Sequence, residues 1–396
     1  MSVHHRQETP TERRDRLCRE FAEDLGDGNY PRIEDYVGRL PEAERPELLT
    51  EFVRRDHACR WQVGEPLTLN AYKARFSGYL EAIARACFTK PAEGGVRYAL
   101  VCVLADGAQA RVYLARDNER DEVVVVKVAR ESTEKVAKQF RRESQFLAKA
   151  GHCLIVPMLD YFELAGRPFV VLEYIRGKTL ASKLKTDGPF SPPEAAWIIE
   201  QIADATHHVH ETMTADGKVL IHRDLKPAHI ILHEGDGKPR LLDFGLADYE
   251  ESGAGLGTSA HHGTMEYMSP EQVTAFLQGV GHVDRRSDVW ALGAVMFEIL
   301  TGRRLFGTRP KRESFESTTE WARAIEKYFQ PRIDENSATI LPDASWAIPE
   351  PLCRIVERCV EKRPDARYRS AGELAHALRQ WRERGMAVAD RHEVSD

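Results

Sequence analysis

The sequence has no long apolar run, no marked excess of one charge and no paired cysteines. Its longest apolar stretch, 289–300, is interrupted by Glu298 and is too short to cross a bilayer. Acidic and basic residues are mixed and the net charge is only −6, so nothing indicates a nucleic-acid partner or a membrane surface. The seven cysteines are scattered, and the N-terminus lacks an apolar signal segment. These absences predict a cytoplasmic protein with reduced thiols and no membrane span.

Two short apolar runs enclose a polar loop whose sequence, HRDLKPAH (222–229), is the most informative in the chain. Nineteen residues after Asp224 comes Asp243, followed by Phe-Gly. The chain thus has an acidic residue, a basic residue two positions later and a second acidic residue before Phe-Gly. This pattern resembles the H-R-D-x-K-x-x-N and D-F-G motifs of eukaryotic-like (Hanks-type) bacterial serine/threonine protein kinases. The family has Asn at the last position of the first motif, where this chain has His229.

This resemblance implies an α+β chain with the bilobal protein kinase fold. A β-rich small lobe and a helical large lobe are then preceded by a small all-α region. We expect the N-terminal helical extension and its linker at 1–97, the kinase domain at 98–385 and a short tail at 386–396. Within the kinase domain, the small lobe is expected at 98–176 and the large lobe at 177–385.

The first 90 residues contain no catalytic constellation. Apolar periodicity predicts helices at 12–25, 31–37 and 42–61, and Thr68 and Ser77 are candidate caps for two more. Two interpretations stay open for these helices. They form either a pack that only shields part of the small lobe or a docking module for a protein partner.

Short β-branched runs at 98–104, 112–115, 123–128 and 169–174 predict strands. Lys127 lies in a run of valines, where an inward-facing lysine needs a charged partner. Glu143, in a helical stretch sixteen residues later, is the candidate. The resemblance implies that this pair holds the α- and β-phosphates of ATP. The alternative is a surface lysine on an edge strand.

The family's G-x-G-x-x-G loop over the nucleotide is degenerate at 105–110, where only Gly107 remains. Val125 stands where the family usually has alanine, which narrows the adenine pocket. The resemblance places the hinge at Glu173. The implied ATP-binding residues are Leu104, Gly107, Val112, Val125, Lys127, Leu172, Glu173 and Ile175.

The resemblance also implies roles for the residues that carry out phosphoryl transfer and bind the metal ion. Asp224 is the base, or the group that orients the substrate hydroxyl, and Lys226 neutralises the transferred phosphoryl group. Asp243 chelates Mg²⁺. An imidazole nitrogen suits Mn²⁺ better than Mg²⁺, so His229 in the second ligand position predicts a weak or metal-shifted enzyme that uses ATP with Mg²⁺ or Mn²⁺.

The segment between Asp243 and Glu271 matches the family's activation segment. Candidate phosphorylation sites there are Ser252, Thr258 and Ser259, and Thr264 is expected near Asp224 and Lys226. An unmodified loop is the alternative.

Three further expectations concern the large lobe. Glu271 should pair with Arg367, and a buried Asp288 should accept hydrogen bonds from the catalytic-loop backbone. His207, His208 and His210 are expected to be exposed to solvent rather than to bind a metal.

The leading interpretation is an ATP-dependent serine/threonine protein kinase that acts on protein substrates. The alternative is a pseudokinase that serves as a nucleotide-binding or scaffold module, favoured by the two alanines of the 105–110 loop, by Val125 and by His229. A small-molecule kinase is disfavoured because the segments GT (263–264), SPE (269–271) and DVW (288–290) resemble those of kinases that act on proteins.

Overall fold

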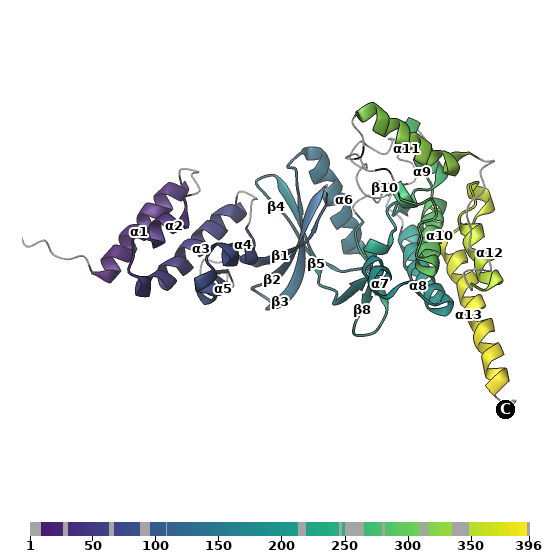
Figure 1. Cartoon of the computed structure of the whole chain (residues 1–396), viewed down its shortest axis with the longest axis horizontal. Helices are drawn as coiled ribbons and strands as arrows, with labels where there is room; N and C mark the ends of the chain where they lie inside the picture. Colours follow the sequence, from purple (N-terminus) through teal and green to yellow (C-terminus); the bar gives the residue numbers. More distant parts are fainter. Residues whose placement is uncertain are drawn as a thin grey trace, which may run out of the picture. The chain divides into compact units, whose positions relative to one another are not determined.

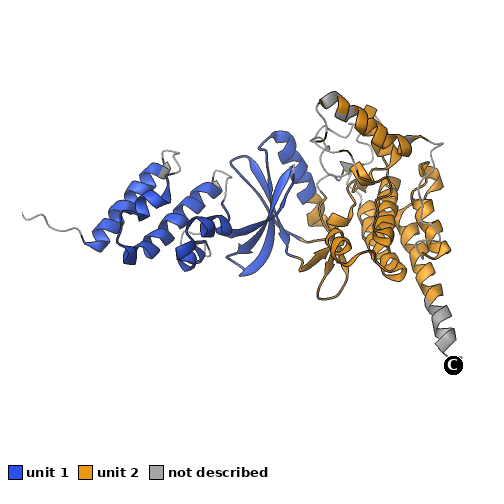
Figure 2. Cartoon of the chain, viewed as in Figure 1, with its two compact units in different colours: residues 1–144, 158–174 blue, residues 145–157, 175–396 orange. Residues whose placement is uncertain are grey.

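The structure is a computed structural model. It describes residues 9–26, 31–62, 67–87, 96–107, 109–212, 219–244, 248–249, 265–278, 282–308, 310, 314, 317–334 and 348–393. The chain divides into two units, which Figure 2 shows in separate colours. Unit 1 is Met1–Ser144 with Met158–Tyr174, and unit 2 is Gln145–Pro157 with Ile175–Asp396.

Unit 1 begins with five helices, labelled in Figure 1. They are α1 (Pro10–Gly26), α2 (Ile33–Val37), α3 (Arg45–Gln62), α4 (Leu69–Arg75) and α5 (Leu80–Cys87). Their apolar faces meet in one core, where the rings of Phe21 and Phe52 stack with centroids 4.3 Å apart. The Thr68 hydroxyl caps α4 by accepting a hydrogen bond from the Ala71 amide (3.1 Å), as predicted. Ser77 instead begins a 3-10 turn that precedes α5.

The other part of unit 1 is a five-stranded antiparallel sheet with strand order β1-β2-β3-β5-β4. Its strands are β1 (Tyr98–Asp106), β2 (Ala110–Asp117), β3 (Glu122–Ala129), β4 (Met158–Leu164) and β5 (Arg167–Glu173). The predicted strands are confirmed, but β4 was not predicted. Most residues of β4 are half-buried, so its sequence lacks the alternation of buried and exposed positions that marks a strand.

The N-terminal helices share a core with one face of this sheet. Trp61 of α3 is 4% exposed, and its ring lies 5.4 Å from that of Phe169 and 6.3 Å from that of Phe162. The Asn118 amide donates to the carbonyl of Val96 (2.8 Å), which ties the β2–β3 turn to the start of the sheet. These contacts agree with the shielding interpretation of the N-terminal helices, whereas docking of a partner stays a prediction.

Helix α6 (Glu134–Ala150) carries Glu143 and crosses the boundary between the units. The remaining helices belong to unit 2. They are α7 (Leu180–Asp187), α8 (Pro192–Glu211), α9 (Pro270–Gln278), α10 (Arg286–Thr301), α11 (Thr318–Ile333), α12 (Glu350–Cys359) and α13 (Ala371–Glu393). The last helix continues to Glu393, beyond the expected end of the kinase domain at 385.

Helix α10 is the centre of unit 2, because every residue from Ser287 to Thr301 is buried. A Cβ on Gly293 would lie only 2.4 Å from the Cβ of Cys359, so α10 and α12 approach closely at this glycine. Helix α13 packs along α8 (Figure 1), where Arg379 and Arg382 both bond Glu200, at 2.9 and 2.5 Å.

Short strands frame the predicted catalytic loop. Strands β6 (Gly177–Thr179), β8 (Ile230–His233) and β9 (Pro239–Leu241) form one antiparallel sheet, and β7 (Leu220–Ile221) pairs with β10 (Asp248–Tyr249). The loop at 222–226 therefore leaves β7 and, after a 3-10 turn at Pro227–His229, enters β8. Regular pairing on both sides fixes the position of a loop that has little regular structure of its own.

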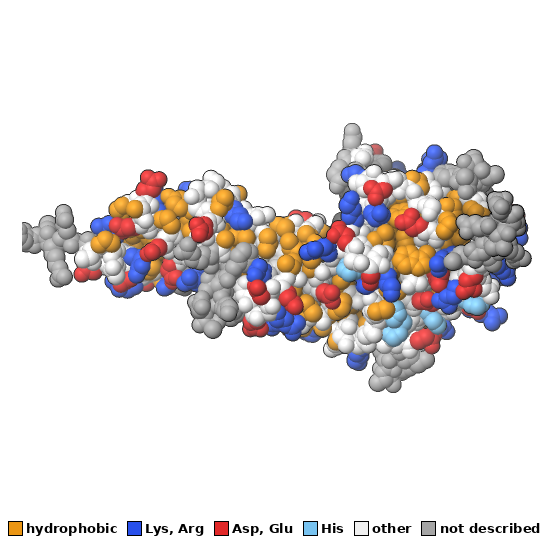
Figure 3. All heavy atoms as spheres, turned by 90° about the horizontal axis from the view of Figure 1, so that it is seen from below, with side chains coloured by type: hydrophobic (Ala, Val, Ile, Leu, Met, Phe, Trp, Pro, Cys, Tyr) orange, Lys and Arg blue, Asp and Glu red, His pale blue; other side chains and the backbone are white. Residues whose placement is uncertain are grey.

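The surface shows the mixing of charges predicted from the sequence. On the face drawn in Figure 3, acidic and basic side chains of the described residues are interspersed. Within the described ranges, none of the helices combines the length and the apolar composition that crossing a membrane requires.

Candidate active site

The residues predicted to bind the nucleotide phosphates come together in unit 1. Lys127 Nζ lies 2.8 and 3.0 Å from the two carboxylate oxygens of Glu143, and the two residues are only 8% and 3% exposed. Strand β3 lies between β2 and β5, so the alternative of a surface lysine on an edge strand is wrong. A buried ammonium and a buried carboxylate at this distance neutralise each other, which offsets the free-energy cost of burying each charge.

Sheet register brings several predicted nucleotide contacts beside this pair. Val112 is the register partner of Lys127, and Val125 is the partner of Leu172. Leu104 is about half exposed on β1, and Glu173 is exposed at the end of β5. Ile175 belongs to unit 2 and is buried there.

The degenerate loop closes as a hairpin held by its own residues. The Gly107 amide donates to the carbonyl of Ala110 (3.0 Å), and a Cβ on Gly107 would lie 3.1 Å from that oxygen. Arg130 donates to the Gly107 carbonyl (2.6 Å) and bonds Asp106, which also pairs with Arg111 at 3.0 Å. The amide that a phosphate would use at Gly107 thus bonds within the loop, and ion pairs fix a segment that glycines leave mobile in the family.

In unit 2 the catalytic loop brings an acid and a base together. Lys226 Nζ donates to Asp224 Oδ2 (2.9 Å). Asp224 is 6% exposed, and its other carboxylate oxygen, Oδ1, has no hydrogen-bond partner within the described part of the chain. Buried acceptors are nearly always satisfied, so an open one beside a lysine indicates a ligand that donates a hydrogen bond.

Backbone strain marks both acidic segments. Arg223 and Asp243 have positive φ angles of 63° and 56°, in a region that non-glycine residues seldom occupy. Such strain collects at functional sites, where the surrounding packing enforces it. Here the buried rings of His222 and Phe244 pack with centroids 4.5 Å apart.

His229 lies between the two acids. Its Nδ1 donates to the backbone carbonyl of Asp224 (3.0 Å), and its Nε2 lies 3.4 Å from Asp243 Oδ2. Burial lowers the pKa of His229 to about 4, although the neighbouring carboxylates of Asp243 and Asp224 oppose this shift. At neutral pH the ring is uncharged, so the proton resides on Nδ1 and the lone pair is on Nε2.

These atoms suit a divalent cation. Nitrogen and oxygen ligands bind such ions at about 2.0–2.2 Å, so Nε2 and Oδ2 can share one ion. No group of three or more His, Cys, Asp or Glu side chains that could hold a metal occurs among the residues with described positions. His229 Nε2 and Asp243 Oδ2 are thus two candidate ligands, and phosphate oxygens and water would have to complete the coordination of an ion bound there.

The loop is anchored from beneath by Asp288 of α10. Its carboxylate accepts hydrogen bonds from the amides of His222 (2.8 Å) and Arg223 (2.9 Å), which confirms the predicted role. His210 Nε2 lies 2.8 Å from the same carboxylate and is fully buried. The expectation of an exposed His210 is therefore wrong, because a partner 78 positions away in the sequence draws this side chain inward.

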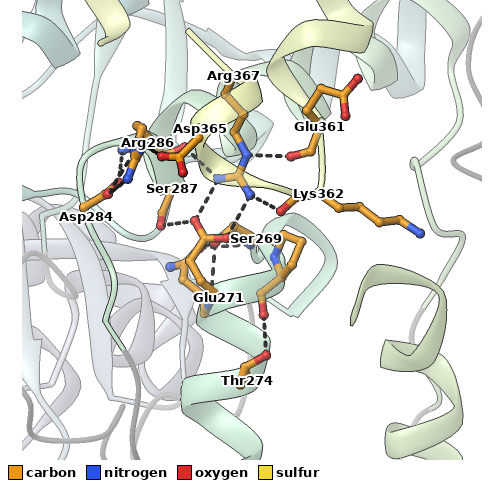
Figure 4. Close-up of polar contacts among 12 residues, drawn as sticks. Ser269, Glu271, Thr274, Asp284, Arg286, Ser287, Glu361, Lys362, Asp365 and Arg367 are labelled. Carbon is orange, nitrogen blue, oxygen red and sulfur yellow. Dashed lines mark hydrogen bonds and ion pairs between the residues drawn. The ribbon is translucent and has the colours of Figure 1, made fainter. Parts of the chain in front are cut away.

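A second buried ion pair fixes the segment after the activation loop. Arg367 binds both carboxylate oxygens of Glu271, at 2.7 and 2.8 Å, and also donates to the carbonyls of Glu361, Lys362 and Arg286 (Figure 4). This confirms the predicted pair. Ser252, Thr258, Ser259 and Thr264 lie outside the described residues, so their roles stay predictions.

Comparison with known proteins agrees with this geometry. The family model described as protein kinase domain matches residues 98–378. The chain is 36% identical over 210 residues to the serine/threonine-protein kinase PrkC of Bacillus subtilis, a match that covers 52% of this chain and 31% of that protein. It is 32% identical over 296 residues to the serine/threonine-protein kinase PknB of Mycolicibacterium smegmatis, covering 72% and 43%.

The matched part of the chain thus spans 31% and 43% of the length of these two curated relatives. The matched segment includes the buried Lys127–Glu143 pair, the strained catalytic loop and the Glu271–Arg367 pair. Since the family model covers well over half of the sequence, the chain belongs to the protein kinase family and resembles its bacterial serine/threonine members.

Proposed function

We propose that this chain transfers the γ-phosphoryl group of ATP to serine and threonine hydroxyls of protein substrates. The observation that carries the proposal is Asp224, a buried carboxylate with one oxygen bonded to Lys226 and the other open to a donor. A substrate hydroxyl is a donor of the right kind, and its oxygen becomes the nucleophile when Asp224 accepts its proton.

Each further residue has a role that its surroundings support. The hydroxyl oxygen forms the new bond to phosphorus, the bond from phosphorus to the bridging oxygen breaks, and ADP leaves. Lys226 offsets the negative charge of the moving phosphoryl group, and Lys127, oriented by Glu143, binds the phosphates that stay with ADP. We assign nucleotide binding in unit 1 to the residues predicted from the sequence, from Leu104 to Glu173.

We assign His229 and Asp243 as protein ligands of the nucleotide's metal ion. A bound divalent cation neutralises phosphate charge. The neutral imidazole favours Mn²⁺ over Mg²⁺, because nitrogen is a softer donor than the amide oxygen of the family's asparagine. Hence we expect activity that is weak with Mg²⁺ and stronger with Mn²⁺.

A scaffold role is the second candidate, and the closed loop at 105–110 favours it. There the Gly107 amide is bonded to Ala110 rather than free for phosphate. A protein of this kind would keep the kinase fold, bind nucleotide poorly and act through a partner of the N-terminal helices. We place this partner-binding role in residues 1–97 and phosphoryl transfer in 98–385.

The test is transfer from γ-labelled ATP by the purified chain in the cytoplasmic pH range, with Mg²⁺ or Mn²⁺. Autophosphorylation and a generic protein substrate are both measured, beside Asp224→Asn and Asp243→Ala. Transfer that both substitutions abolish supports the kinase. Absence of transfer with either metal, together with no thermal stabilisation by ATP, contradicts it and favours the scaffold.

A further inference from the structure

Unit 2 contains a cavity of about 390 Å³ whose wall includes Lys226. Helix α7, the catalytic loop, the 3-10 turn Met265–Tyr267 and the end of α10 form the rest of the wall. Lys226 Nζ is 2.9 Å from Asp224, so a polypeptide that presents a hydroxyl to Asp224 has its neighbouring side chains beside this cavity. The cavity is thus placed to contact a substrate residue near the acceptor.

Two carboxylates lie in its wall, and both are nearly buried. Glu266 is 7% exposed and Glu298 is 9% exposed. A pair of carboxylates in a cavity would ordinarily attract a lysine or arginine side chain, because a buried negative charge needs a cation. Taken alone, these two carboxylates would select basic substrates, although Lys185 and Lys226 also lie in the wall.

The chain already supplies the positive charge. Arg304 Nη1 donates to Glu266 (3.0 Å), and Arg304 Nε lies 3.6 Å from Glu298. The Tyr267 hydroxyl donates to Glu298 (2.5 Å) and stays protonated, because burial and that carboxylate raise its pKa. The fully buried Arg332 donates to the backbone carbonyl of Glu266 (2.9 Å) and adds a second cation close to that residue. Two glutamates are therefore balanced by two arginines.

The two arginines differ in how tightly their side chains are packed. Arg332 is locked between aromatic rings, with Phe306 and Tyr328 within 4.5 and 4.7 Å of its guanidinium carbon. The side chain of Arg304 is 37% exposed at the cavity. Arg304 thus occupies the position at which a basic substrate side chain would bind, and it can be removed without opening the core.

We propose that Arg304 is a specificity-determining residue that fills this acidic site from within. The cavity then takes an uncharged side chain of the substrate and rejects a basic one, which would meet Arg304 as a like charge and find no carboxylate available. The inference rests on the proposed kinase function, since it assigns the substrate side of the same site.

The experiment compares acceptor peptides that carry Leu or Arg at single positions within four residues of the acceptor. Binding is measured by fluorescence anisotropy of labelled peptides in which alanine replaces the acceptor serine, so the readout needs no turnover. The ratio of kcat/KM values for the serine peptides is measured in parallel. The proteins are the full chain, Arg304→Met, Arg304→Lys as the charge-conserving control, and Arg304→Met/Glu298→Gln.

The unaltered chain should bind Arg peptides no better than Leu peptides. Arg304→Met should raise the Arg-to-Leu ratio at least about tenfold at one position, because it leaves two carboxylates facing the cavity. Arg304→Lys should keep the original ratio, and adding Glu298→Gln should remove most of the gain. A merely structural role for Arg304 would weaken binding of both peptides equally.

Two results would overturn the proposal: a strong preference of the unaltered chain for Arg peptides, or an unchanged ratio in folded Arg304→Met. If that variant does not fold, Arg304→Gln has the same expected outcome. A shifted binding ratio without phosphate transfer would reject the kinase function alone, so the two failures are distinguishable.

Discussion

The predicted site residues of the two units differ in how their charges are balanced. In unit 1, Lys127 and Glu143 form a pair that is complete within the protein. In unit 2, the carboxylates of Asp224 and Asp243 flank an uncharged His229, and Lys226 Nζ donates to Asp224. These four unit 2 side chains sum to one negative charge at neutral pH.

This difference predicts which of the two groups of residues depends on a bound ligand for its stability. A satisfied pair keeps its geometry with or without nucleotide, whereas two acids around a neutral imidazole are most stable when a cation joins them. Both units depart from the family's sequence, unit 1 in the 105–110 loop and unit 2 at His229. From the charge balance, we expect substitutions at Lys127 and Glu143 to act first on stability and those at His229 and Asp243 to act first on metal use.

Breaking the complete pair should have the largest effect. Lys127→Met leaves the Glu143 carboxylate buried without its ammonium, so we expect a loss of about 3–5 kcal/mol in unfolding free energy and at least about a hundredfold loss of transfer. Denaturant unfolding and the labelled-ATP assay measure the two effects.

Lys127→Met/Glu143→Met is the matched control, because it removes both charges. It should recover most of the stability and none of the activity. Equal stability of the single and double variants would contradict this account of the pair.

The Glu271–Arg367 pair tests whether sensitivity to the metal is confined to the predicted metal ligands or extends over the whole of unit 2. Arg367→Met strips Glu271 of a bidentate partner and should cost about 3 kcal/mol or more in unfolding free energy. Metal preference should not change, because Glu271 bonds Arg367 and Ser287 rather than the metal ligands. An altered Mn²⁺-to-Mg²⁺ activity ratio in this variant would extend the metal-sensitive region beyond His229 and Asp243.

A buried histidine outside the site, His57, should make the stability of the folded chain depend on pH. Burial lowers the pKa of His57 in α3 to about 4, and its Nε2 accepts from the Trp61 indole (3.2 Å). The unfolded chain binds this proton near pH 6.5 and the folded chain does not, so stability is fully present above pH 6.5 and falls as the pH drops towards 4.

The loss attributable to His57 should be about 2 kcal/mol at pH 5 relative to pH 7.5. Urea unfolding across that range measures it, and His57→Gln should flatten the slope by this amount. An unchanged slope would mean that the pKa of His57 is the same in the folded and the unfolded chain.

The smallest effect is expected at His229, which stands where the family has asparagine. His229→Asn restores the amide oxygen of the family and should lower the Mn²⁺-to-Mg²⁺ activity ratio about tenfold, which corresponds to roughly 1.4 kcal/mol. Steady-state rates with each metal give the ratio, and His229→Gln is the control with a longer amide. No gain with Mg²⁺ in His229→Asn would sink the assignment of His229 as the metal-shifting residue.

The sequence predicted the parts of the site that rest on local spacing. Lys127 with Glu143, and Asp224 with Lys226, were found because strand, helix and loop patterns place them in a known order. The buried His210–Asp288 contact was missed because its partners lie 78 positions apart and no pattern marks His210. The ion pairs of Asp106 with Arg111 and Arg130 were missed for a related reason, since only the hairpin register brings them together.

Similar limits apply to the fold. The predicted strands were found because they are rich in β-branched residues, whereas β4 (MLDYFEL) contains none. Arg304 stands in a basic pair that the sequence assigns most simply to a solvated surface. Its role depends on two glutamates that tertiary structure delivers to one cavity.

The most direct test of the central claim is the binding of Mn²⁺ with a non-hydrolysable ATP analogue, followed by electron paramagnetic resonance. If His229 and Asp243 hold the nucleotide's metal, the unaltered chain should bind one Mn²⁺ per nucleotide. Asp243→Ala should abolish that binding and His229→Leu should weaken it at least about tenfold. Equal Mn²⁺ affinity in all three proteins would contradict the claim.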